Sequence, residues 1–138
     1  MNAEMPCPCH SQKLYRDCCE RYHKGEPPEN ALALMRSRYA AYALGLVDYI
    51  IATTHPKNSH YLEDHTKWKE EILRFSQATH FEGLTIHEFV DDAQTAYVTF
   101  TAILKQKGND ASFTEKSRFE KVDGRWLYRD GQMIPSFP

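Results

Sequence analysis

The chain has 138 residues, of which 41% are hydrophobic, 26% charged and 12% aromatic. This composition is typical of a soluble globular protein, and the length suits one ordinary domain with a small appendage, which excludes disordered and fibrous classes. The net charge of -2 provides no overall positive field, so nucleic acid is not expected as a partner. There is neither a secretory signal nor an apolar run near the roughly 18 residues of a membrane span, so we expect a cytoplasmic protein that does not enter the membrane.

Four cysteines lie close together near the start of the chain, whereas a disulfide-stapled domain would spread them. They are Cys7, Cys9, Cys18 and Cys19. Four thiolates in 13 residues suit tetrahedral zinc, and a single iron is the alternative for the same ligands. His10 or His23 could replace Cys19 as the fourth ligand. Four protein ligands leave no position for a reactive water, so the spacing indicates a structural site.

A short proline spacer ends this segment at Pro27 and Pro28, and we place a boundary between residues 1–27 and 28–138 there. An amphipathic helix is predicted next, capped by Asn30 and ended by Gly45, with one apolar stripe. The stripe comprises Leu32, Met35, Tyr39, Tyr42 and Leu46. A second helix should begin at Asp48 and stop before Pro56, and a third should cover residues 62 to 77.

From Phe81 the hydrophobic period changes to two, which indicates antiparallel strands. Turns are predicted at residues 108–110 and at Asp123-Gly124, and strands on either side of them. The expected fold class is α+β, with three helices packed on a curved antiparallel sheet of about four strands.

The run Cys7-Pro-Cys-His-Ser-Gln-Lys-Leu-Tyr-Arg-Asp-Cys18-Cys19 resembles the SEC-C motif, a zinc-binding element known from the translocase ATPase SecA. The motif's ligands map onto the four cysteines. His10 and Gln12 stand where the motif usually has glycine, and so does Glu20. The resemblance implies contact of the SecB or ribosome type, but acidic and basic residues balance in residues 1–28, so we expect an unknown protein partner rather than RNA.

The run from Ala31 to Pro56, together with the ending Ser117-Arg-Phe-Glu-Lys-Val-Asp-Gly-Arg-Trp-Leu-Tyr-Arg-Asp-Gly131, resembles the YchJ-like family. That family implies a nuclear transport factor 2-like domain, a cone of helices and curved sheet. Such cones often enclose a pocket. Its candidate residues here are Tyr39, Tyr42, His55, Trp68, His87, Arg118 and Tyr128.

Each pocket candidate also has an ordinary structural explanation. His55 could cap or pack beside Pro56, the face of His87 depends on strand register, and Arg118 could pair with Asp130. We expect the aromatic residues to pack in the core rather than to line a cavity. We expect Arg36 and Arg38 to form an ion pair or to lie on a solvated face rather than to bind an anion. We therefore favour a non-enzymatic protein-interaction or ligand-binding module, with a small isomerase or dehydratase as the alternative.

Overall fold

A computed structural model describes residues 4–135. The helical part comes first: a 3-10 turn at Tyr15–Asp17, then α1 (Glu20–His23), α2 (Ala31–Leu44), α3 (Val47–Ala52) and α4 (His65–Ala78). The strands follow as β1 (His80–Val90), β2 (Thr95–Gln106), β3 (Asn109–Asp110), β4 (Phe113–Val122) and β5 (Arg125–Ile134). In this part of the chain, every helix is too short or too polar to cross a membrane.

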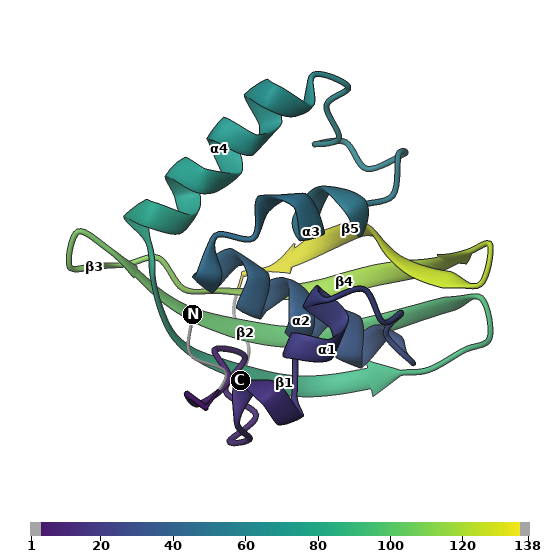
Figure 1. Ribbon diagram of the computed structural model, residues 1–138, viewed down its shortest axis with the longest axis horizontal. Coiled ribbons are helices and arrows are strands. Elements are labelled where there is room, and N and C mark those ends of the chain that lie inside the picture. The colour runs from purple at the N-terminus through teal and green to yellow at the C-terminus, as the bar shows by residue number, and fades with distance from the viewer. Residues whose placement is uncertain (1–3, 136–138) are drawn as a thin grey trace.

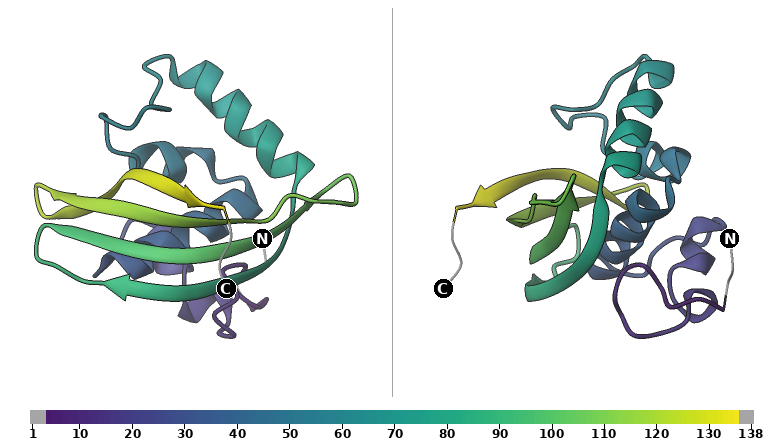
Figure 2. Two further views of the ribbon diagram at one scale, coloured as in Figure 1. Left: turned by 180° about the vertical axis from the view of Figure 1, so that it is seen from behind. Right: turned by 90° about the vertical axis from the view of Figure 1, so that its left-hand side faces the viewer.

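The strands form one antiparallel sheet in the order β1-β2-β4-β5, and β3 pairs with the end of β2. Helices α2, α3 and α4 all lie on one side of this curved sheet (Figure 1, Figure 2). The predicted α+β class is confirmed. Residues 4–135 contain five strands where about four were expected, because Asn109 and Asp110, predicted as a turn, pair with Gln106 and Lys105.

Helix α2 begins and ends where its capping residues predict. The Asn30 side chain accepts a hydrogen bond from the Ala33 backbone N–H at 2.8 Å, and Gly45 ends the helix in the left-handed conformation with φ of 72°. The single predicted apolar stripe is incomplete, since Ser37, Ala40 and Ala41 are also fully buried. The helix is buried on more than one side, because the cysteine segment covers the side that faces away from the sheet (Figure 2).

Two boundaries differ from the sequence prediction. Leu46, not Asp48, occupies the N-cap of α3, and the Asp48 carboxylate instead pairs with Lys69 at 2.9 Å. Helix α4 starts at His65, three residues later than expected, because the Asp64 side chain caps it by accepting from the Lys67 backbone N–H. Along α4, Trp68 and Ile72 are buried, and they pack against Ala41 of α2 and against Ile50 and Ile51 of α3.

Candidate metal centre and ligand cavity

The cysteine segment folds into a compact loop, called here the knuckle (residues 4–27). Its backbone closes through hydrogen bonds from Cys7 N to Lys13 O at 2.9 Å and from Cys18 N to Tyr15 O at 3.0 Å. Two residues of the loop, His10 and Gln12, have positive φ values of 61° and 71°. Such backbone is natural for glycine, which explains why the SEC-C pattern usually has glycine at these positions.

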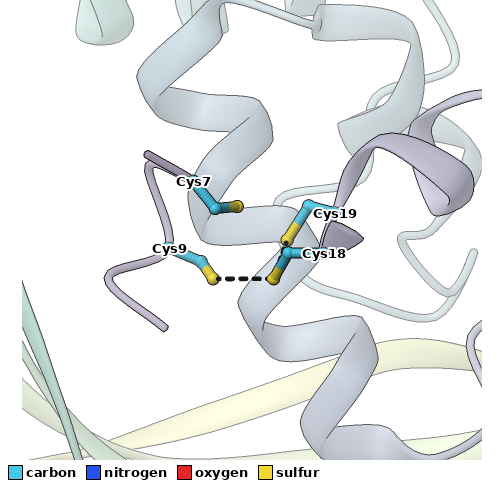
Figure 3. A group of neighbouring side chains, drawn as sticks. All are labelled: Cys7, Cys9, Cys18 and Cys19. Atoms are coloured by element: carbon cyan, nitrogen blue, oxygen red, sulfur yellow. Dashed lines mark hydrogen bonds between the residues drawn. The ribbon is translucent and has the colours of Figure 1, made fainter. Parts of the chain in front are cut away.

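The four cysteine side chains point toward one another from two sides of the knuckle (Figure 3). Cys7 and Cys9 come from the first loop, and Cys18 and Cys19 from the turn that leads into α1. The Cys18 Sγ lies 3.5 Å from the Cys9 Sγ and 3.8 Å from the Cys19 Sγ, and all four sulfurs lie within 4.8 Å of one another. None of the four forms a disulfide.

These separations match the size of a tetrahedral metal site. A zinc ion with bonds of about 2.3 Å places its sulfur ligands about 3.8 Å apart. The thiols also perturb one another: hydrogen bonding to Cys18 lowers the pKa of Cys9 and raises the pKa of Cys19. Contact with Cys19 lowers the pKa of Cys18 to about 6. Thiols this close share protons, and a cation is needed to ionise all four together.

The surroundings close the site and favour Cys19 over a histidine as the fourth ligand. Cys9 and Cys19 have no exposed surface, and Ala40 of α2 packs against the cluster. Both ring nitrogens of His23 are engaged, Nδ1 with the Tyr15 hydroxyl at 2.6 Å and Nε2 with the Ser37 carbonyl at 2.8 Å. The ring of His10 faces away, since its Nε2 donates to the Phe81 carbonyl at 3.2 Å.

Arg36, on α2, connects this helix to the knuckle. Its Nη1 donates to the Cys9 carbonyl at 3.1 Å and lies 4.0 Å from the Cys9 Sγ. The prediction of an ion pair or a solvated face is wrong for this residue. A cation beside the sulfur cluster offsets part of the negative charge that four thiolates around a dication would leave.

A cavity of about 520 Å³ opens between α2, α4 and the concave face of the sheet. Four of the predicted pocket residues line it: Tyr39, Tyr42, Trp68 and Tyr128. The rest of the wall is largely aliphatic and aromatic, including Phe100 and Phe119. Tyr39, Phe100 and Phe119 belong to the buried core, as expected, and they also line this cavity.

The other three pocket candidates lie outside the cavity. His55 is buried, but its Nδ1 accepts from the Lys57 backbone N–H at 3.0 Å and its Nε2 faces Glu120 at 3.5 Å. His87 is exposed and bonds to the Thr101 hydroxyl at 2.7 Å. Arg118 forms a bidentate pair with Asp130, with Nε donating at 3.0 Å. This is the structural pairing that was predicted from the sequence as the alternative to a pocket role.

Three charged residues of the cavity wall, Arg38, Glu71 and Glu115, were not among the predicted pocket residues. Glu115 lies on β4, where Phe113, Glu115, Ser117 and Phe119 alternate onto the cavity face; this alternation was the available signal. Arg38 is 8% exposed. Its Nη1 donates to the Ile50 carbonyl at 3.1 Å and to the hydroxyls of Thr53 and Thr54, an arrangement of neutral acceptors that replaces the predicted ion pair.

The comparisons with known proteins agree with both parts of the structure. A model of the SEC-C motif matches residues 6–21, and a model described as YchJ, middle NTF2-like domain, matches residues 30–131. UPF0225 proteins of Deinococcus radiodurans and Sodalis glossinidius are 40% and 37% identical over 130 and 134 residues. These alignments cover 91% and 94% of this chain and 87% and 84% of those proteins.

A solved structure shows the same arrangement. The solution structure of a SEC-C motif containing protein from Rhodopseudomonas palustris has 32% sequence identity and a TM-score of 0.79, covering 94% of this chain and 99% of that one. The chain therefore belongs to the YchJ-like UPF0225 family, with a SEC-C motif followed by a nuclear transport factor 2-like domain.

Proposed function

We propose that this protein is a non-enzymatic ligand-binding module in which a structural zinc knuckle fixes one wall of the cavity. The observation that supports it most directly is the open cavity of about 520 Å³, a volume within the range of small-molecule sites. Its wall combines many apolar side chains with few polar groups, as such sites usually do.

Zinc is proposed because four sulfur ligands suit it best, with iron as the alternative. Cys7, Cys9, Cys18 and Cys19 would hold the ion, and it would supply folding free energy to a segment too small to gain enough from burial. The test is metal analysis of the purified protein beside a Cys18→Ser, Cys19→Ser variant. One zinc per chain in the wild type, and none in the variant, is expected. Iron in place of zinc, or metal retained by the variant, would contradict the assignment.

Ligand binding can be measured directly with a neutral aromatic probe, 2-naphthylmethanol, by titration calorimetry. Ala102 is 2% exposed and lines the cavity, so Ala102→Leu should fill part of the space and weaken binding. Thr85→Leu, at an exposed position of β1, is the matched control and should bind as the wild type does. Equal binding by all three proteins would place the probe elsewhere.

The isomerase or dehydratase alternative has less support. Both imidazoles considered as bases, those of His55 and His87, lie outside the cavity lining. The lining groups that could accept a proton are the carboxylates of Glu115 and the exposed Glu71 and the imidazole of the exposed His60. A base of this kind also needs a hydrogen-bond donor for the oxyanion. Turnover of enolisable ketones that disappears in Glu115→Gln would favour the enzyme.

The protein partner expected from the SEC-C resemblance stays a prediction. Affinity capture with the wild type and with the Cys18→Ser, Cys19→Ser variant tests it. A partner identified only with the wild type would make the knuckle the recognition element, whereas an identical set from both would exclude that role.

A further inference from the structure

We propose that the cavity binds an organic cation, an amine attached to an apolar or aromatic body, and that the Glu115 carboxylate receives the ammonium group. This inference rests on the proposed ligand-binding function and names its ligand class. Four features of the cavity support this inference. They are a carboxylate held in position, a glycine that leaves space for it, aromatic walls, and an arginine whose charge is already hydrogen-bonded within the protein.

The carboxylate of Glu115 is held in one position by two hydroxyl groups. Ser117 Oγ donates a hydrogen bond to Oε2, and the Tyr128 hydroxyl donates to the same oxygen at 3.0 Å. Within residues 4–135, no lysine, arginine or histidine forms a salt bridge with Glu115, and no hydrogen bond reaches its Oε1. One carboxylate oxygen of this cavity-lining residue thus has no hydrogen-bond or salt-bridge partner within the described residues.

Gly131 of β5 makes room for this arrangement. It pairs with Ser117 across the sheet, and a Cβ at this position would lie 2.3 Å from the Glu115 carboxyl carbon and 2.7 Å from the Tyr128 hydroxyl oxygen. Any other residue at 131 would push the carboxylate aside. The absence of a side chain here therefore permits the contact between Glu115 and Tyr128.

The aromatic wall favours a positively charged ligand over a negative one. Tyr39, Tyr42 and Phe119 line the cavity together with Trp68, and aromatic ring faces attract ammonium groups and repel anions. A protonated amine would form a charge-assisted hydrogen bond with Glu115, while its apolar body would contact the rings. A neutral ligand would cover the carboxylate without supplying a counter-charge, which is unfavourable.

Arg38 does not reverse this preference. Besides its three oxygen acceptors, its guanidinium lies over the Tyr128 ring at 4.8 Å. Its charge is thus already surrounded by oxygen dipoles and a ring face. The cavity lining contains a second carboxylate, that of the exposed Glu71, and one exposed histidine, His60, so carboxylates outnumber guanidinium groups in the lining.

The test compares three ligands of one shape by titration calorimetry at pH 7.5: 2-naphthylmethylamine, 2-naphthylmethanol and 2-naphthoate. The amine should bind about tenfold more tightly than the alcohol, the effect of one charge-assisted hydrogen bond, and the acid should bind most weakly. Glu115→Gln keeps the size and an acceptor oxygen but removes the charge, so it should abolish the preference for the amine. Glu88→Gln, at an exposed position of β1, should keep it.

Gly131→Ala provides an independent test, because it displaces the carboxylate without altering its charge. It should reduce the preference for the amine while leaving alcohol binding within a few fold of wild type. Equal affinity for amine and alcohol, or tighter binding of the acid, would overturn the cation assignment and leave the ligand-binding function in place. If none of the three ligands binds to folded wild-type protein, both proposals fail.

Discussion

Acidification should destabilise this protein through His23, the histidine that joins the knuckle to α2. The Ser37 carbonyl can only accept, so His23 Nε2 carries the proton of the 2.8 Å hydrogen bond, and Nδ1 accepts from the Tyr15 hydroxyl at 2.6 Å. This network fixes the neutral form. Burial lowers the pKa of His23 below its usual 6.5, so the unfolded chain takes up a proton that the folded chain resists.

The sign and limit of the effect follow from that difference. Stability is retained above the unfolded pKa and is lost as the pH falls below it. Between pH 7 and pH 5.5 the loss is at most about 1.3 kcal/mol for one histidine that stays neutral when folded. The ring keeps some solvent contact, so the measured loss should be smaller.

Urea unfolding at both pH values, for the wild type and His23→Gln, measures this contribution. Both proteins keep the four cysteines, so the pH dependence of the metal site is the same in both. The contribution of His23 is therefore the loss of unfolding free energy in the wild type minus the loss in His23→Gln. His80→Gln, at an exposed position of β1, should show the wild-type loss. The reasoning is refuted if His23→Gln loses as much stability as the wild type on acidification.

Two further predictions concern stability. Gln12→Gly should stabilise the zinc-loaded protein by about 1 kcal/mol in urea unfolding, because it relieves a left-handed backbone with φ of 71° at an exposed position; a loss of stability would contradict this. Leu34→Ala should cost about 3 kcal/mol, since Leu34 is fully buried, whereas Leu73→Ala, at a side chain 40% exposed, should cost under about 1 kcal/mol. Equal midpoints for the two alanine variants would count against this core assignment.

Features set by neighbouring residues could be predicted from the sequence. The cap at Asn30, the end of α2 at Gly45 and the Asp123-Gly124 turn each depend on local backbone preferences, and the structure places all three as expected. The grouping of the cysteines was equally accessible, because their sulfurs are supplied by one short segment.

Features that depend on distant contacts were missed. Ala40 is buried because the knuckle packs on α2. The hydrophobic periodicity of the helix could not predict that this side would be covered. Glu115 gains its significance from Tyr128 and Gly131 on another strand. The hydrogen-bond acceptors of Arg38 lie on α3 and just after it. The spacing of charged residues along α2 gives no information about these acceptors.

His10 connects the metal centre to the cavity, although it departs from the usual glycine of the motif. Its Nε2 donates to the Phe81 carbonyl at 3.2 Å, and its ring meets the Tyr39 ring edge-on with centroids 5.8 Å apart. Tyr39 and Phe81 both line the cavity and contact each other edge-on at 5.6 Å. The knuckle therefore contacts two cavity-lining residues through one side chain.

This contact predicts that the cavity depends on His10 separately from the metal. His10→Gly should keep the four cysteines and their zinc, because glycine suits the left-handed backbone at φ of 61°. It should nevertheless weaken binding of 2-naphthylmethanol by a few fold, since Tyr39 and Phe81 lose the side chain behind them. Gln12→Gly, the neighbouring left-handed position, should leave binding unchanged. Wild-type affinity in His10→Gly, with zinc still bound, would show that the knuckle stabilises the chain without shaping the cavity.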